Sequence, residues 1–178
     1  MKHKILILLM IPILLLVTAC NDVKTKENDD SKKIEIIDQT KQIETTFSYD
    51  KKIGFSEIST YNNDSPTIEF DCVKLDIDFQ MSYKELDTNI YEDTQKNRKN
   101  KKYYKEYTFG KYEAYVYGDY ENNITMNIHL RKQDKSSIIL VVTMNRLDSD
   151  ENIVIADILD DKELQDFFNT IEVKRIEK

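Results

Sequence analysis

The feature that most constrains this chain is the alternation of apolar and polar residues in several of its segments. Residues 124–131 place a large apolar side chain at every second position, with polar residues between them. Val73–Gln80 alternates in the same way. A period of two is typical of strands with one buried and one solvated face. Ser137–Met144 is apolar on both faces, which predicts a central strand covered on both sides.

Other segments add to this β-rich pattern. Tyr103–Phe109 and Lys111–Tyr117 are rich in aromatic and β-branched residues, and Gly110 lies between them, so we expect a hairpin. Further strands are predicted near three shorter runs, Ile43–Tyr49, Phe55–Thr60 and Thr67–Phe70.

One helix is predicted between the strands. Ser82 and Glu85 have the spacing of a capping box, which favours a helix from Ser82 to about Asn100. The apolar stripe of this helix is narrow and consists of Tyr83, Leu86 and Ile90.

A second helix is predicted near the C-terminus, where Asp160 is a candidate N-cap and Glu163 its reciprocal partner. Four apolar residues then follow at helical spacing and form one face: Leu164, Phe167, Phe168 and Ile171. Val173 is expected to begin a short final strand, and Asn152–Leu159 fits either a strand or a helix.

This order of elements indicates an α+β fold with an antiparallel β-sheet packed with helices. Residues 47–55 (FSYDKKIGF) resemble the opening strand and turn of PsbP-like domains, and residues 164–173 (LQDFFNTIEV) resemble their closing helix and strand. Asp50 stands where that family often has proline. The resemblance implies an α/β/α sandwich that serves as a small accessory or binding module without a fixed catalytic site.

The N-terminus predicts export. Lys2 and Lys4 precede an uncharged apolar run, Ile5–Val17, which has the length of a signal-peptide core and is too short to span a bilayer. Residues 17–20 (VTAC) resemble a bacterial lipobox. This resemblance implies cleavage after residue 19 and acylation of Cys20, which would hold the protein on the extracytoplasmic face of the cell membrane. The abundance of Lys, Asn and Ile favours a Gram-positive source over an outer-membrane location.

Three regions follow from these boundaries: a signal peptide (1–19), a lipidated cysteine with a flexible polar tether (20–33), and a single α+β domain (34–178). Cleavage removes Lys2 and Lys4 from the 26 basic residues, so 24 remain against 33 acidic ones and the net charge becomes −9. Such an acidic domain is not expected to bind nucleic acid, which requires clustered cations.

No catalytic, metal or cofactor motif is evident. Cys72 and His129 are the only thiol and imidazole expected in the acylated, mature domain, and their pairing would be needed for a small envelope enzyme. Residues 148–152 begin like a calcium loop, but Ile153 replaces the required glycine and Leu159 the closing glutamate. We therefore expect neither enzyme activity nor a bound cofactor or metal.

The concentration of tyrosines between residues 103 and 120 marks a candidate binding face. A two-residue turn at Gly110–Lys111 would place Tyr104 opposite Tyr117. A three-residue loop at 121–123 would then put Tyr115 and Tyr117 outside, whereas a two-residue loop would put them in the core. If exposed, the face would contact a glycan, peptide or protein. We call it the tyrosine face: Tyr104, Tyr115, Tyr117, Asn127, His129 and Arg131.

A second candidate is the basic island, which could meet an anionic partner or simply complement the end of a helix. It consists of Lys96, Arg98, Lys99, Lys101, Lys102 and Lys105. Together these features predict a non-catalytic, membrane-anchored binding or accessory module of the cell envelope. The alternatives are an immunity-type lipoprotein that sequesters a peptide and the Cys72/His129 enzyme.

Overall fold

The computed structural model describes residues 27–28, 31–61, 66–132, 135–147 and 154–176. The predicted signal peptide (1–19), Cys20 and the calcium-like loop at 148–152 lie outside these residues. Within them the protein is mostly β, with two antiparallel sheets and a few short helices. The predicted antiparallel architecture is therefore confirmed, although the strands form two sheets rather than one.

The larger sheet has seven strands in the order β4-β5-β6-β10-β9-β8-β7. Their bounds are β4 Ser59–Tyr61, β5 Thr67–Cys72, β6 Ile77–Asp87, β7 Tyr103–Phe109, β8 Tyr112–Tyr120, β9 Asn123–Lys132 and β10 Ser136–Arg146. The expected central position of β10 is confirmed, since it pairs with β6 on one side and β9 on the other.

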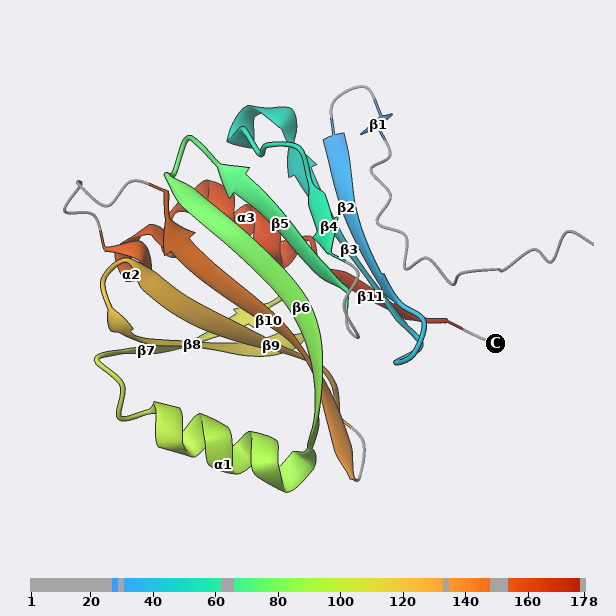
Figure 1. Cartoon of the computed structure of the whole chain (residues 1–178), viewed down its shortest axis with the longest axis vertical. Helices are drawn as coiled ribbons and strands as arrows, with labels where there is room; N and C mark the ends of the chain where they lie inside the picture. Colours follow the sequence, from blue (N-terminus) through green and yellow to red (C-terminus); the bar gives the residue numbers. More distant parts are fainter. Residues whose placement is uncertain (1–26, 29–30, 62–65, 133–134, 148–153, 177–178) are drawn as a thin grey trace, which may run out of the picture.

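The smaller sheet has the order β1-β2-β3-β11, formed by β1 Glu27–Asn28, β2 Ser31–Asp38, β3 Ile43–Asp50 and β11 Glu172–Arg175. β2 thus begins three residues before the boundary predicted for the domain, with Ser31 opposite Asp50. The helical elements are η1 Lys51–Ile53, α1 Thr88–Arg98, α2 Ile155–Ile158 and α3 Lys162–Asn169. In Figure 1, α1 and the smaller sheet lie on opposite sides of the seven-stranded sheet.

The main core lies between the two sheets and α3. The apolar stripe predicted for the C-terminal helix is buried, and the ring of Phe167 stacks on that of Phe47 in β3 at 5.0 Å between centroids. Phe168 packs against Phe109 of β7 at 5.2 Å. α3 therefore joins the smaller sheet to the far edge of the larger one.

The predicted start of the first helix is wrong. Ser82 does not cap a helix, because the alternation of β6 continues through Tyr83, whose buried hydroxyl donates to the Ile36 carbonyl of β2. The helix begins at Thr88, with Asp87 as its N-cap residue. Its predicted end near Asn100 is close to the observed Arg98. Tertiary packing thus outweighs the local capping signal.

The strand predicted from the alternation of Val73–Gln80 begins four residues too early. Residues 73–76 form a turn with Val73 largely exposed, and the strand begins only at Ile77. Asp76 has a left-handed backbone (φ 56°) and its carboxylate pairs with the guanidinium of Arg146, which is 2% exposed. This partly buried ion pair holds the turn against the end of β10.

The C-terminal helix is predicted correctly except for its cap. Asp161, rather than Asp160, accepts hydrogen bonds from the backbone N–H groups of Glu163 and Leu164. Asp160 instead pairs with Lys105. Aspartate is a favourable N-cap residue, and two aspartates are adjacent here. The sequence alone therefore did not show which of the two caps the helix.

Candidate functional site

The tyrosine-rich hairpin has the register expected for the Gly110–Lys111 turn. Tyr104 lies opposite Tyr117 and Glu106 opposite Tyr115. All three tyrosines therefore share one face of the seven-stranded sheet, the face that α1 covers.

The next loop has the length of one alternative derived from the sequence and the side-chain orientation of the other. It has the two-residue form, with Tyr120 opposite Asn123, yet Tyr115 and Tyr117 do not face the main core. A bulge between Tyr117 and Tyr120 shifts the register by one residue and turns their side chains to the other face. Gly118 makes this bulge possible, because a Cβ there would lie 2.9 Å from the Asn123 carbonyl oxygen.

Most of the tyrosine face is nevertheless packed rather than free. Tyr91 of α1 lies over it, and Tyr115 is only 1% exposed. Asn127 is also buried and donates to the Tyr115 hydroxyl at 2.7 Å. The ring of His129 lies 4.4 Å from that of Tyr91, and burial lowers the pKa of His129. These residues form a second, smaller core under α1.

Tyr104 and Tyr117 are the part of this face that keeps partial exposure. Cations cover them as well, since the Arg98 guanidinium lies 4.6 Å from the Tyr117 ring and the Lys99 ammonium 5.7 Å from the Tyr104 ring. Arg131, the sixth predicted residue, borders a separate hollow between β9 and β11. The predicted face is therefore not one continuous binding surface.

The basic island is largely paired within the domain. Lys96 and Arg98 occupy the last turn of α1, where cations complement the helix dipole. Four lysines of the island contact carboxylates of this same chain: Lys99 with Glu106, Lys101 with Asp119, Lys102 with Glu121 and Lys105 with Asp160. The helix-end alternative therefore fits Lys96 and Arg98, whereas Lys99, Lys101 and Lys102 pair with carboxylates of the hairpin and its following loop, and Lys105 pairs with Asp160 before α3.

Cys72 and His129 are not brought together. Cys72 is buried on the core face of β5, where its thiol donates to the Ile53 carbonyl at 3.3 Å, and burial raises the thiol pKa. His129 lies on the opposite face of β9. Since β6 and β10 separate the two strands, they are three strand spacings apart, about 14 Å. The pair therefore cannot act as nucleophile and base in this arrangement.

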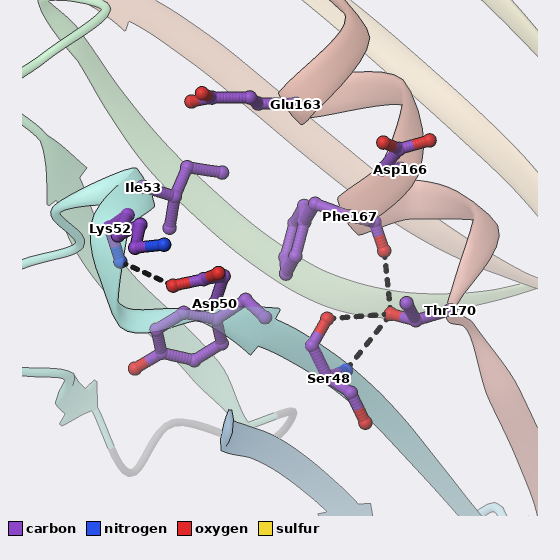
Figure 2. Close-up of a pocket in the computed structure, with 9 residues that line it drawn as sticks. Ser48, Asp50, Lys52, Ile53, Glu163, Asp166, Phe167 and Thr170 are labelled. Atoms are coloured by element: carbon purple, nitrogen blue, oxygen red, sulfur yellow. Dashed lines mark hydrogen bonds between the residues drawn. The ribbon is translucent and has the colours of Figure 1, made fainter. Parts of the chain in front are cut away.

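A pocket that sequence reasoning missed lies where β3 and η1 meet α3 (Figure 2). It is a hollow of about 260 Å³, which we call the β3–α3 pocket. Its lining residues are Ser48, Tyr49, Asp50, Lys52, Ile53, Glu163, Asp166, Phe167 and Thr170. Eight of these nine fall within the two segments, 47–55 and 164–173, that carry the PsbP-like resemblance.

Hydrogen bonds fix the walls of this pocket. The Thr170 hydroxyl donates to the Ser48 carbonyl and accepts from the Ser48 N–H, both at 2.9 Å, and so joins the end of α3 to β3. Asp50 caps η1 by accepting from the Lys52 N–H at 2.9 Å. Figure 2 shows these bonds on either side of the opening.

The floor and the rim of the β3–α3 pocket differ in chemistry. Tyr49, Ile53 and Phe167 supply an apolar floor, and each is at most 7% exposed. Three carboxylates stand at the rim against one ammonium group: Asp50, Glu163 and Asp166 with Lys52. Glu163 also pairs with Lys74 outside the lining. The pocket therefore suits a group with an apolar body and a positive charge.

Among the described residues, no three His, Cys, Asp or Glu side chains cluster closely enough to bind a metal ion. Nor does that part of the chain contain a helix with the length and apolar character needed to cross a membrane. Comparison with models of known protein families found no match, and searches of curated proteins and of solved structures found no significant similarity.

Proposed function

We propose that this chain is an extracytoplasmic lipoprotein, anchored to the cell membrane by acylated Cys20, that acts as a non-catalytic binding or accessory module of the cell envelope. Residues 1–20 support the anchor. The observation that supports binding is the β3–α3 pocket, with its aromatic floor and acidic rim.

The ligand group is a basic side chain of a peptide or envelope protein. A hollow of about 260 Å³ is smaller than the roughly 300–1,000 Å³ of sites that hold a whole small ligand, so it suits one side chain of a larger partner. Lysine and arginine combine an apolar stem with a charged end. The stem would lie on Phe167 and Tyr49, and the charge would meet Asp166 or Glu163. In the immunity-type version of this proposal, the sequestered peptide is basic.

The PsbP-like resemblance is retained as a proposal about the fold. Helices α1 and α3 lie on opposite faces of the seven-stranded sheet, which supports an α/β/α arrangement. The smaller sheet, β1-β2-β3-β11, is a further element that an α/β/α sandwich with a single sheet does not include.

The binding proposal is tested by a pull-down with the mature lipidated protein, solubilised from membranes in detergent. The test variant is Asp166→Lys, because Asp166 is exposed on α3 and its reversal leaves the core intact. The matched control is Asp93→Lys, an exposed position on α1. We expect partners retained by the wild type and the control to be lost from Asp166→Lys. Equal recovery with both variants would refute the pocket as the site.

The anchor is tested separately with Cys20→Ala. Metabolic labelling with a palmitate analogue should modify the wild type and not the variant. The variant should also leave the membrane fraction. Labelling that persists in Cys20→Ala would contradict acylation at this residue.

A further inference from the structure

A second hollow, of about 200 Å³, lies between β11, β9 and the turn before β8. We call it the basic hollow, because four cations line it: Lys111, Arg131, Lys174 and Arg175. Its apolar wall includes Tyr112, Leu130 and Ile43, which are all buried. β3 connects the two sites, since Ile43 lines the basic hollow and Asp50 the β3–α3 pocket. The nearest lining residues of the two sites on this strand, Ile43 and Ser48, are five residue steps apart, or about 17 Å.

Three of the four cations of the basic hollow have no carboxylate partner, unlike most lysines of the basic island. Four of the five lysines of the basic island contact a carboxylate, as Lys101 does with Asp119. Among the described residues, Lys111, Arg131 and Arg175 have no carboxylate within ion-pair distance, and the Arg131 Nε is buried without an acceptor. Lys174 has only a long contact of 3.9 Å with Glu44. Four cationic residues therefore line one recess, with the Lys111 ammonium 5.3 Å from the Tyr112 ring and a single carboxylate, Glu44, at the long distance from Lys174.

This arrangement attracts anions. Like charges around a recess with low-dielectric walls reinforce one another and raise the local positive potential. Arginine and lysine N–H groups make their strongest hydrogen bonds to phosphate and carboxylate oxygens. A phosphate group carries more oxygens than a carboxylate and can engage several of the four cations together. The volume admits such a group but no drug-sized ligand.

We propose that the basic hollow binds a phosphate group, with Arg131 and Lys111 as its principal donors. The phosphate reaches the hollow either on a soluble or wall-borne molecule or on a lipid headgroup. This site is independent of the β3–α3 pocket, whose rim has the opposite charge.

The test uses the mature lipidated protein in nanodiscs of phosphatidylcholine, with sn-glycerol 3-phosphate as the probe and calorimetry as the readout at constant ionic strength. We expect saturable binding by the wild type. Arg131→Gln and Lys111→Gln should each weaken it roughly tenfold, as expected for loss of a charge-assisted hydrogen bond. Lys111 is an exposed turn residue, so its variant tests the site even if Arg131→Gln fails to fold.

The matched control is Lys132→Gln, which removes one positive charge from the exposed residue next to Arg131 that pairs with Glu92. It should bind the probe like the wild type. Absence of saturable binding, or equal weakening by Lys132→Gln, would overturn the proposal.

Nanodiscs that contain phosphatidylglycerol distinguish the two sources. If the headgroup occupies the hollow, these discs should abolish binding of the soluble probe. If the phosphate is soluble or wall-borne, binding should be the same in both discs. None of these variants changes a residue of the β3–α3 pocket. A negative result for phosphate binding would therefore not bear on the binding proposal for that pocket, which the Asp166→Lys pull-down tests.

Discussion

The hydroxyl of Tyr83 in β6 donates a hydrogen bond to the backbone carbonyl of Ile36 in β2 at 2.9 Å. The bond is buried and joins the two sheets directly. Burial raises the pKa of the Tyr83 hydroxyl, which therefore stays protonated as a donor at neutral pH. The first prediction follows from this contact.

Tyr83→Phe should destabilise the protein by about 1 kcal/mol, because the buried Ile36 carbonyl loses a donor while the ring packing is kept. Urea denaturation of the purified protein measures the change. Tyr120→Phe is the control, since Tyr120 is 70% exposed and should tolerate the loss of its hydroxyl. Equal stability of both variants would show that the bond between the sheets contributes nothing.

The cap of α3 gives a second prediction, in which two adjacent aspartates behave differently. Asp161→Ala should cost about 1 kcal/mol, because two backbone N–H groups lose their acceptor. Asp160→Ala removes only the exposed contacts with Lys105 and Tyr107 and should cost about half as much or less. Thermal denaturation of the two variants side by side measures the difference. The reverse ranking would restore Asp160 as the cap.

The β8 bulge gives a third prediction. Gly118→Ala should destabilise the protein by about 1–3 kcal/mol, because the new Cβ would lie 2.9 Å from both the Asn123 carbonyl oxygen and the Ile124 side chain. Glu113→Ala, an exposed position of the same strand, is the control for alanine itself. Chemical denaturation measures both. A neutral Gly118→Ala would mean that the bulge can relax without cost.

His129 gives a fourth prediction, which concerns pH. Burial under Tyr91 lowers the pKa of His129 from its usual value of 6.5, so the unfolded chain takes up the proton at a higher pH than the folded one. Stability associated with neutral His129 is therefore complete above pH 6.5 and is lost as the pH falls from 6.5 through the lowered pKa.

An NMR titration of the His129 ring should give a midpoint below 6.5, and Tyr91→Ala should move it back toward 6.5. Urea denaturation at pH 7 and pH 5 should show a smaller loss of stability for His129→Gln than for the wild type. A wild-type midpoint at or above 6.5 would contradict the burial of this ring.

Cys72 gives a fifth prediction. Its thiol is buried and its pKa is raised, so little reactive thiolate forms near neutral pH. In a Cys20→Ala background, which leaves Cys72 as the only cysteine, a thiol reagent should react slowly with the native protein and completely in denaturant. The exposed position Val73→Cys in a Cys72→Ala, Cys20→Ala background is the control and should react at once. Rapid labelling of native Cys72 would reopen its role as a nucleophile.

Elements whose signal is local were predicted well. The alternation of β9, the aromatic hairpin around Gly110 and the buried face of α3 each repeat the period of the element they form. Burial of these faces stabilises the same local conformation that the pattern indicates, so pattern and fold agree.

The remaining features depend on residues far apart in the chain. Ser82 and Glu85 form a valid capping pattern, yet the contact between Tyr83 and Ile36 extends β6 through that site. Which face of the sheet Tyr115 occupies depends on the bulge between Tyr117 and Tyr120, and the hydrophobic period of the sequence does not reveal that bulge. The β3–α3 pocket joins Ser48 to Thr170, which are 122 positions apart, so only the folded chain assembles it.

The pairing of Ser31 with Asp50 places the start of β2 beside the β3–α3 pocket. Ten residues lie between Cys20 and Ser31, so the chain takes eleven residue steps between them and, at about 3.3–3.6 Å per step, reaches no further than about 40 Å. If Cys20 is acylated, this tether confines the pocket to a thin layer next to the bilayer, so the domain does not diffuse through the whole extracytoplasmic space. A partner held in the same layer would meet it at an effective concentration far above its bulk value. Weak recognition of a single basic side chain would then suffice for stable association, and release of the lipid anchor would abolish it without any change in the pocket.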